Sequence, residues 1–139
     1  MLFRSPKSPV LGFWIGSTGS LFIMQHVKLV PMQQIDPENL KTKIDTGEAP
    51  FMLDVRTLEE WDICHIEGSV LIPMDEIQRR LDEIPEDREI VVICHHGMRS
   101  AQVLMALAHY FEYDINKLHN LRGGIDLYSI QADESIPRY

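Results

Sequence analysis

The run Ile90-Val91-Val92-Ile93 constrains the fold more than any other stretch of the chain. Its four residues are all β-branched and apolar, and a run this short predicts a buried strand rather than a helix. The chain then passes through Cys94 and a loop that contains Gly97, and a segment rich in Ala, Leu and Met runs from Arg99 to about Phe111. That segment has few polar positions and predicts a mostly buried helix.

The rest of the chain repeats this alternation of strands and helices. We expect further strands near residues 33–35, 51–55, 70–72 and 117–121, and helices over about 37–45, from 58, over 75–84 and over 125–131. In the helix over 75–84 one face is apolar, formed by Ile77, Leu81 and Ile84. The alternation predicts an α/β fold with a parallel sheet and right-handed crossovers. In such sheets ligands bind at the carboxyl ends of the strands, which is where Cys94 lies.

Two of the expected helices carry clear start signals. Asp36 is followed by Pro37, which fits a helix that is capped by the first residue and begins at the second. Thr57 and Glu60 have the spacing of a capping box, in which each side chain bonds the other residue's backbone N–H. A helix that starts in this way directs Trp61 toward the core.

Cys94 is the best candidate for a reactive residue. A cysteine at the turn from a strand into a helix lies where successive backbone N–H groups converge, and that arrangement stabilises negative charge. The cation of Arg99 lies close by in the sequence, at the start of the helix, where the helix dipole disfavours a positive charge. Both features favour a thiolate at Cys94 and an anionic ligand beside it.

Three stretches of this chain, over residues 54–69, 94–100 and 121–125, resemble conserved blocks of the rhodanese (thiosulfate sulfurtransferase) family. The active-site loop is matched by Cys94-x-x-Gly97-x-Arg99-Ser100. The first block is matched by Asp54-Val55-Arg56, Glu59-Glu60-Trp61 and His65-Ile66-Glu67-Gly68-Ser69, and the last block by Leu121-x-Gly123-Gly124-Ile125. The resemblance implies a three-layer rhodanese-like domain over residues 33–139, with a central parallel sheet and helices on both faces.

The same resemblance implies a chemistry and a set of roles. Cys94 would accept a sulfane sulfur from a small anionic donor such as thiosulfate, and the resulting persulfide would pass it to a thiol or protein acceptor. Asp54 and Arg56 would support the active-site loop. The substrate would be bound by the loop residues His95, His96, Gly97, Met98, Arg99 and Ser100. No cofactor is implied, and His95 and His96 have no third ligand at metal-binding spacing, so we expect no metal site.

Two other functions stay open at this point. The fold can serve as a non-catalytic binding or regulatory module, although such a module would be expected to lack the cysteine. Cysteine-dependent phosphatases have a similar loop, but in them the arginine follows the cysteine by six positions, whereas Arg99 follows Cys94 by five. A shorter loop suits a single sulfur atom better than a phosphate. A buried apolar role is expected for Cys64, and a role as a resolving thiol for Cys94 is the alternative.

The net charge of the chain and its residues 1–32 indicate which partners and which cellular location to expect. A net charge of −8 argues against nucleic acid as a partner, because no basic stripe is present. Residues 1–32 form an extension of uncertain structure, and the Gly/Ser-rich run over 16–20 interrupts its apolar stretch. We therefore expect a cytoplasmic protein with no membrane contact, with export or anchoring through residues 1–25 as the minor alternative. The oligomeric state is not indicated.

Overall fold

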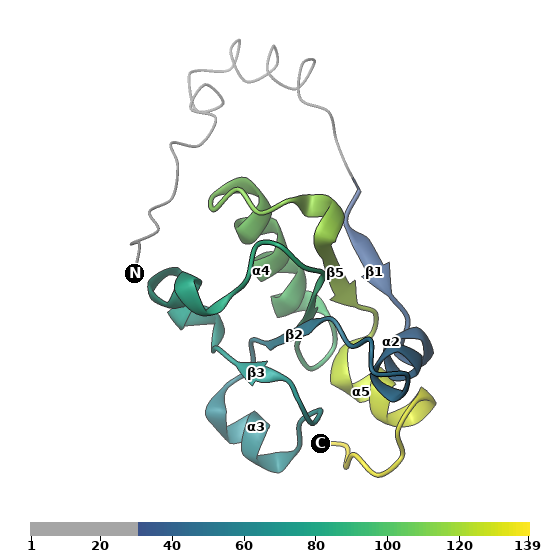
Figure 1. Cartoon of the computed structure of the whole chain (residues 1–139). Helices are drawn as coiled ribbons and strands as arrows, with labels where there is room; N and C mark the ends of the chain where they lie inside the picture. Colours follow the sequence, from purple (N-terminus) through teal and green to yellow (C-terminus); the bar gives the residue numbers. More distant parts are fainter. Residues whose placement is uncertain (1–30) are drawn as a thin grey trace.

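A parallel five-stranded sheet forms the centre of the protein, whose computed structural model describes residues 31–139. The strands are β1 (Gln33–Ile35), β2 (Phe51–Asp54), β3 (Val70–Leu71), β4 (Ile90–Ile93) and β5 (Leu118–Leu121), in the order β1-β5-β4-β2-β3. The apolar run over 90–93 is thus the middle strand, and β1 lies at one edge (Figure 1). Every pair of neighbouring strands is parallel, as the sequence predicts.

Helices cover both faces of the sheet. The α-helices are α2 (Pro37–Asp45), α3 (Leu58–Ile63), α4 (Met98–His109) and α5 (Gly124–Gln131). Residues 31–139 also contain three short 3₁₀ segments: η2 (Met74–Glu76), η3 (Gln78–Glu83) and η4 (Ile115–Lys117). The predicted α/β three-layer fold is confirmed, and the expected ranges agree with these bounds to within a few residues except in the segment over 75–84.

The residues of β4 alternate between two hydrophobic clusters. Ile90 and Val92 pack in one cluster with residues of α4 and η3, whereas Val91 and Ile93 pack in the other with residues of α2 and α5. Because successive side chains of a strand point to opposite faces, the two clusters lie on opposite sides of the sheet. All four residues are at most 1% exposed, so the carboxyl end of this strand is a rigid support for the loop that begins at Cys94.

The segment over 75–84 is not the α-helix that its apolar spacing predicts. It consists of the 3₁₀ segments η2 and η3, and the backbone of Arg80 leaves the helical region at φ −121° and ψ 24°. The guanidinium of Arg80 bonds the carboxylates of Glu76 and Glu83, which holds this break in place. The expected inward residues Ile77, Leu81 and Ile84 are nevertheless buried. Leu81 and Ile84 share one side because residues three apart line up in a 3₁₀ turn, and the break at Arg80 lies between Ile77 and Leu81.

Two details of the helix starts also differ from expectation. Asp36 precedes α2, but its side chain makes no capping bond and instead accepts a hydrogen bond from Arg122 (Nε–Oδ1 2.5 Å). The capping box of Thr57 and Glu60 is present at α3, yet no residue of this six-residue helix is buried. Trp61 is half-buried and stacks on His65, with ring centroids 3.8 Å apart, instead of entering the core.

The extension over residues 1–30 lies outside the described residues, so the expectations for it stay predictions, as does the domain boundary after residue 32. Among residues 31–139 no helix is long and apolar enough to cross a membrane.

Candidate active site

Cys94 lies directly after β4, and its thiol is held by the loop between β4 and α4. The backbone N–H of Gly97 donates a hydrogen bond to Sγ at 3.0 Å. This contact needs the left-handed backbone of Gly97, whose φ of +103° reverses the chain just before α4 begins at Met98. Cys94 is only 1% exposed, so the N–H group acts on the sulfur with little competition from water.

A second polar group reaches the sulfur from α4. Ser100 is fully buried, and its hydroxyl oxygen lies 3.2 Å from the sulfur of Cys94. The same hydroxyl donates to Oδ1 of Asn120 on β5 at 2.5 Å, and Nδ2 of Asn120 donates to the Gly97 carbonyl at 3.1 Å. A hydroxyl has one proton, so Ser100 accepts from the thiol while it donates to Asn120, and can turn to donate when the sulfur is ionised.

The first residues of α5 hydrogen-bond the loop between β4 and α4 from its other side. The N–H groups of Ile125 and Asp126 donate to the carbonyls of Cys94 (2.9 Å) and His95 (3.1 Å). Gly124, with a φ of +65°, makes this close approach possible, because a Cβ there would overlap the His95 carbonyl oxygen. The Gly123-Gly124 motif therefore serves the loop as well as the helix.

Arg99 is paired with an acid of this chain. Its Nη1 and Nη2 donate to the two carboxylate oxygens of Glu60 on α3, at 2.7 and 2.9 Å. This pairing raises the pKa of Arg99 and is the largest cause holding the pKa of Glu60 well below its usual range. The cation that opens α4 thus meets an anion, as its unfavourable place in the helix dipole indicates, but that anion is a side chain.

Behind this pair lies a fully buried ion pair. Arg56 and Asp54 are both 0% exposed, with Nη2 and Oδ2 2.7 Å apart. Arg56 also donates to the carbonyl of Cys64 at 2.8 Å and to the hydroxyl of Tyr139 at 2.9 Å. That hydroxyl donates in turn to Glu60 at 2.7 Å, so the end of β2, α3 and Arg99 form one connected network.

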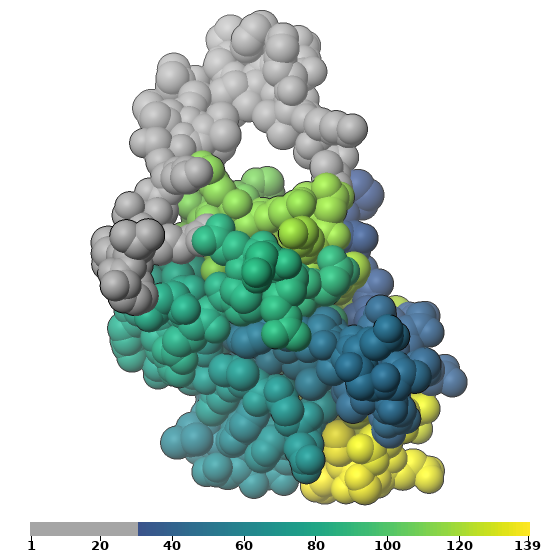
Figure 2. Space-filling view, viewed as in Figure 1, coloured from purple at the N-terminus to yellow at the C-terminus, as the bar shows by residue number. Residues whose placement is uncertain are grey.

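The residues around Tyr139 lie beside α3. In the space-filling view the yellow end of the chain sits against the α3 region at the lower side of the molecule (Figure 2). The ring of Tyr139 stacks on His95, with centroids 4.0 Å apart and planes 9° apart. Burial lowers the pKa of His95, and the neighbouring His96 lowers it further.

The remaining loop residues face outward. His96 has a side chain that is 62% exposed and lies 3.7 Å from the carboxylate of Asp126, and Met98 is 74% exposed. The structure therefore brings the loop residues from Cys94 to Ser100 together at the end of the central strand. Two of them, Gly97 and Ser100, contact the sulfur, whereas Arg99 bonds Glu60.

Four contributors to the site were not singled out by the sequence. Asn120 bonds Ser100, Glu60 bonds Arg99, Tyr139 covers His95, and Asp126 approaches His96. Only Glu60 had a signal, from its place in the capping box and in the first block of the family resemblance, and neither indicates a partner for Arg99. Together with His95 and His96, Asp126 forms a group of side chains that is able to hold a metal ion.

Cys64 is buried, as expected, but it packs on the other face of the sheet from Cys94. It packs in the cluster that contains Val91 and Ile93, whereas Cys94 packs in the cluster on the other face of the sheet. Burial raises the pKa of the Cys64 thiol. Both cysteines are free, and the placement gives no support to a direct disulfide between them.

Comparison with known proteins places these features in a family. A family model described as a rhodanese-like domain matches residues 36–131. A sulfurtransferase of Allochromatium vinosum is 35% identical over 94 residues, which cover 68% of this chain and 85% of that protein. The crystal structure of SSP1007 from Staphylococcus saprophyticus is 31% identical, with a TM-score of 0.63, over 77% of this chain and all of that chain.

Longer proteins contain a similar stretch. A probable adenylyltransferase and sulfurtransferase of Mycobacterium tuberculosis, MoeZ, is 35% identical over 107 residues. The chain covers 26% of the length of MoeZ and 36% of the length of YrkF of Bacillus subtilis.

Proposed function

The chain belongs to the family of rhodanese-like domains, and from this premise we propose that it is a sulfurtransferase that carries sulfur as a persulfide on Cys94. Relatives named as sulfurtransferases support sulfur transfer as the general activity. The contacts within the site support the finer assignment of residues and substrates.

The observation that carries the proposal is the environment of the Cys94 sulfur. A nucleophilic sulfur must be stable as an anion, and Gly97 N–H at 3.0 Å and the Ser100 hydroxyl at 3.2 Å are both able to donate to it. The loop that carries the Gly97 N–H is fixed by Asn120 and by the start of α5 before any substrate binds, so this donor stabilises charge without reorganising. The Ser100 hydroxyl becomes the second donor by turning its proton from Asn120 to the sulfur. A core cysteine with no reactive role would need neither donor.

The reaction proceeds in two halves. The Cys94 thiolate attacks the outer sulfur of the donor, the S–S bond of thiosulfate breaks, and sulfite leaves with the bonding electron pair. Cys94 then carries a persulfide. In the second half a thiolate or cyanide attacks the outer sulfur of the persulfide, and the Cys94 thiolate leaves with the electron pair. No cofactor takes part in either half.

The network around Arg99 bears on the choice of donor. Because Glu60 bonds both terminal nitrogens of Arg99, this cation offers a dianion less attraction than an unpaired arginine would. Thiosulfate remains our proposed test donor, and donors of lower charge are expected to react as well. The acceptor is a small thiol or a protein, and a cytoplasmic location fits these partners.

The proposal is tested by measuring thiocyanate formation from thiosulfate and cyanide with the purified chain. We expect turnover by the wild type and none by Cys94→Ser. Hydrolysis of an aryl phosphate by the wild type, without thiocyanate formation, would support the phosphatase alternative instead. Absence of both activities, with a thiol that takes up no sulfur, would leave the chain as a binding module of the same fold.

A further inference from the structure

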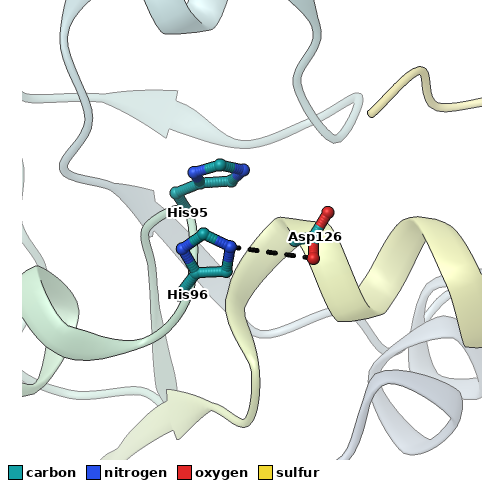
Figure 3. Close-up of side chains that lie close together, drawn as sticks. All are labelled: His95, His96 and Asp126. Atoms are coloured by element: carbon teal, nitrogen blue, oxygen red, sulfur yellow. Dashed lines mark ion pairs between the residues drawn. The ribbon is translucent and has the colours of Figure 1, made fainter. Parts of the chain in front are cut away.

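Three side chains with metal-binding atoms meet next to the proposed active site. His95 and His96 come from the loop after Cys94, and Asp126 comes from the first turn of α5 (Figure 3). One ligand atom of each lies within 4.8 Å of those of the other two, and in the part of the chain that the structure describes this is the one group of three or more such residues. The sequence did not indicate it, because Asp126 is far from the histidines along the chain.

One ring nitrogen of His95 makes no hydrogen bond. Its Nε2 atom is buried and has no hydrogen-bond partner, whereas buried polar atoms in folded proteins are almost always bonded. The ring is held in position by stacking on Tyr139.

His96 lies close to Asp126 and has the freedom to adjust, whereas the side chain of Asp126 is only 16% exposed. Nε2 of His96 lies 3.7 Å from Oδ2 of Asp126, and atoms bound to one zinc ion at about 2.0–2.1 Å each lie roughly 3.3 Å apart in a tetrahedral site. The side chain of His96 is 62% exposed, so closing this small difference moves no packed group. A carboxylate with two imidazoles suits zinc and related transition metals, and it leaves a position open for water or a sulfur ligand.

One neighbour opposes a cation at this place. Arg138 donates to both oxygens of Asp126, from Nε at 2.9 Å and from Nη2 at 3.2 Å. Its side chain is 61% exposed and can turn into solvent, and each carboxylate oxygen keeps a second lone pair. Arg138 therefore competes with a metal ion for Asp126 without closing the site.

We propose that His95, His96 and Asp126 form a reversible binding site for a zinc-class divalent cation beside the loop that carries Cys94. Two of the three ligands are the residues that follow the nucleophile, so the ion ties this loop to the start of α5. The inference concerns binding alone and does not depend on the sulfurtransferase proposal.

The test is the affinity of the whole chain for Zn²⁺, measured by calorimetry or equilibrium dialysis. All variants carry Cys94→Ser, so that zinc bound by the reactive thiol does not contribute. We expect one ion per chain and an affinity that falls about tenfold or more in Asp126→Asn. Arg138→Gln should raise the affinity several-fold, since it removes the competing cation, and Mg²⁺ in excess should not displace the zinc.

The matched control is His109→Ala, which removes a histidine from the far end of α4. Thermal unfolding without metal checks that each variant is folded. An unchanged affinity in both Asp126→Asn and Arg138→Gln would overturn the proposal, as would loss of binding in His109→Ala. Because Arg138→Gln is expected to strengthen binding, misfolding of Asp126→Asn would not remove the test.

Discussion

Arg99 and Glu60 face each other through two hydrogen bonds, from Nη1 to Oε1 at 2.7 Å and from Nη2 to Oε2 at 2.9 Å. One residue opens the helix behind the proposed nucleophile, and the other is the capping-box acid of α3. The pair joins two elements that are distant along the chain, and it neutralises the cation of the site within the protein itself.

The first prediction concerns how this pair sets the preference for donors. Arg99→Ala leaves Glu60 as an unpaired negative charge, so KM for thiosulfate should rise by about tenfold. Glu60→Gln should lower KM for thiosulfate, because it frees the cation while glutamine preserves the capping box. An uncharged organic trisulfide should react with similar kinetics in all three proteins.

Initial rates with both donors, at saturating acceptor, distinguish these effects. Equal loss of activity toward both donors in Arg99→Ala would mean that Arg99 only holds the loop together.

The second prediction concerns acid. In the folded protein the hydrogen bonds from Arg99 keep the pKa of Glu60 below the ordinary value of 4.5. A carboxyl group with a lowered pKa contributes stability above its unfolded pKa, and that contribution is lost as the pH falls. Wild type should therefore be more stable than Glu60→Gln at pH 7, and the difference should shrink below about pH 4.5.

Thermal unfolding of both proteins from pH 7 to pH 3 measures this difference. A gap in Tm that stays constant over the whole range would contradict the assignment to Glu60 ionisation.

The third prediction concerns the close contact between Gly124 and the active-site loop. It distinguishes the effect of this contact from the backbone strain that any non-glycine residue has at a positive φ. In Gly124→Ala the new Cβ would overlap the carbonyl oxygen of His95, so the loop or α5 has to move. Gly47→Ala is the matched control, because Gly47 has a φ of +78° but no atom within 4 Å of the added group. Both variants should lose about 1–2 kcal/mol from backbone strain.

Only Gly124→Ala should also lose most of its sulfur-transfer rate, measured well below the unfolding temperature. A similar rate in the two variants would show that the close approach of α5 does not support the loop.

The fourth prediction concerns the buried pair beneath α3. Asp54→Ala leaves the fully buried guanidinium of Arg56 without its carboxylate, and breaking such a pair costs about 3–5 kcal/mol. Asp62→Ala removes an exposed acid from α3 and should change stability by less than about 0.5 kcal/mol. Urea unfolding of the two variants gives both values, and a similar small change in each would contradict a structural role for Asp54.

The parts of this protein that the sequence predicts are those encoded by neighbouring residues. The run from Ile90 to Ile93, the turn at Gly97 and the helix after it are local patterns, and they predict the central strand and the place of Cys94 correctly. Apolar spacing also predicts the burial of Ile77, Leu81 and Ile84, because it reports which side chains share a face. It does not distinguish an α-helix from the 3₁₀ turns observed there.

The parts that it does not predict depend on contacts across the fold. Glu60 reaches Arg99, Asn120 reaches Ser100, and Asp126 reaches His96 only because the parallel sheet aligns the ends of its strands. The outward position of Trp61 has a similar origin, since α3 is too short to bury a face. A resemblance to a family located the loop, but the partners of its side chains required the three-dimensional arrangement.

A sulfur atom carried by Cys94 is the central expectation for this protein. The measurement is the intact mass of the purified chain after incubation with thiosulfate and removal of the donor. We predict a gain of one sulfur atom that is lost on treatment with cyanide, is absent in Cys94→Ser and persists in Cys64→Ser. A chain that gains no sulfur, or a gain that remains in Cys94→Ser, would contradict the persulfide mechanism.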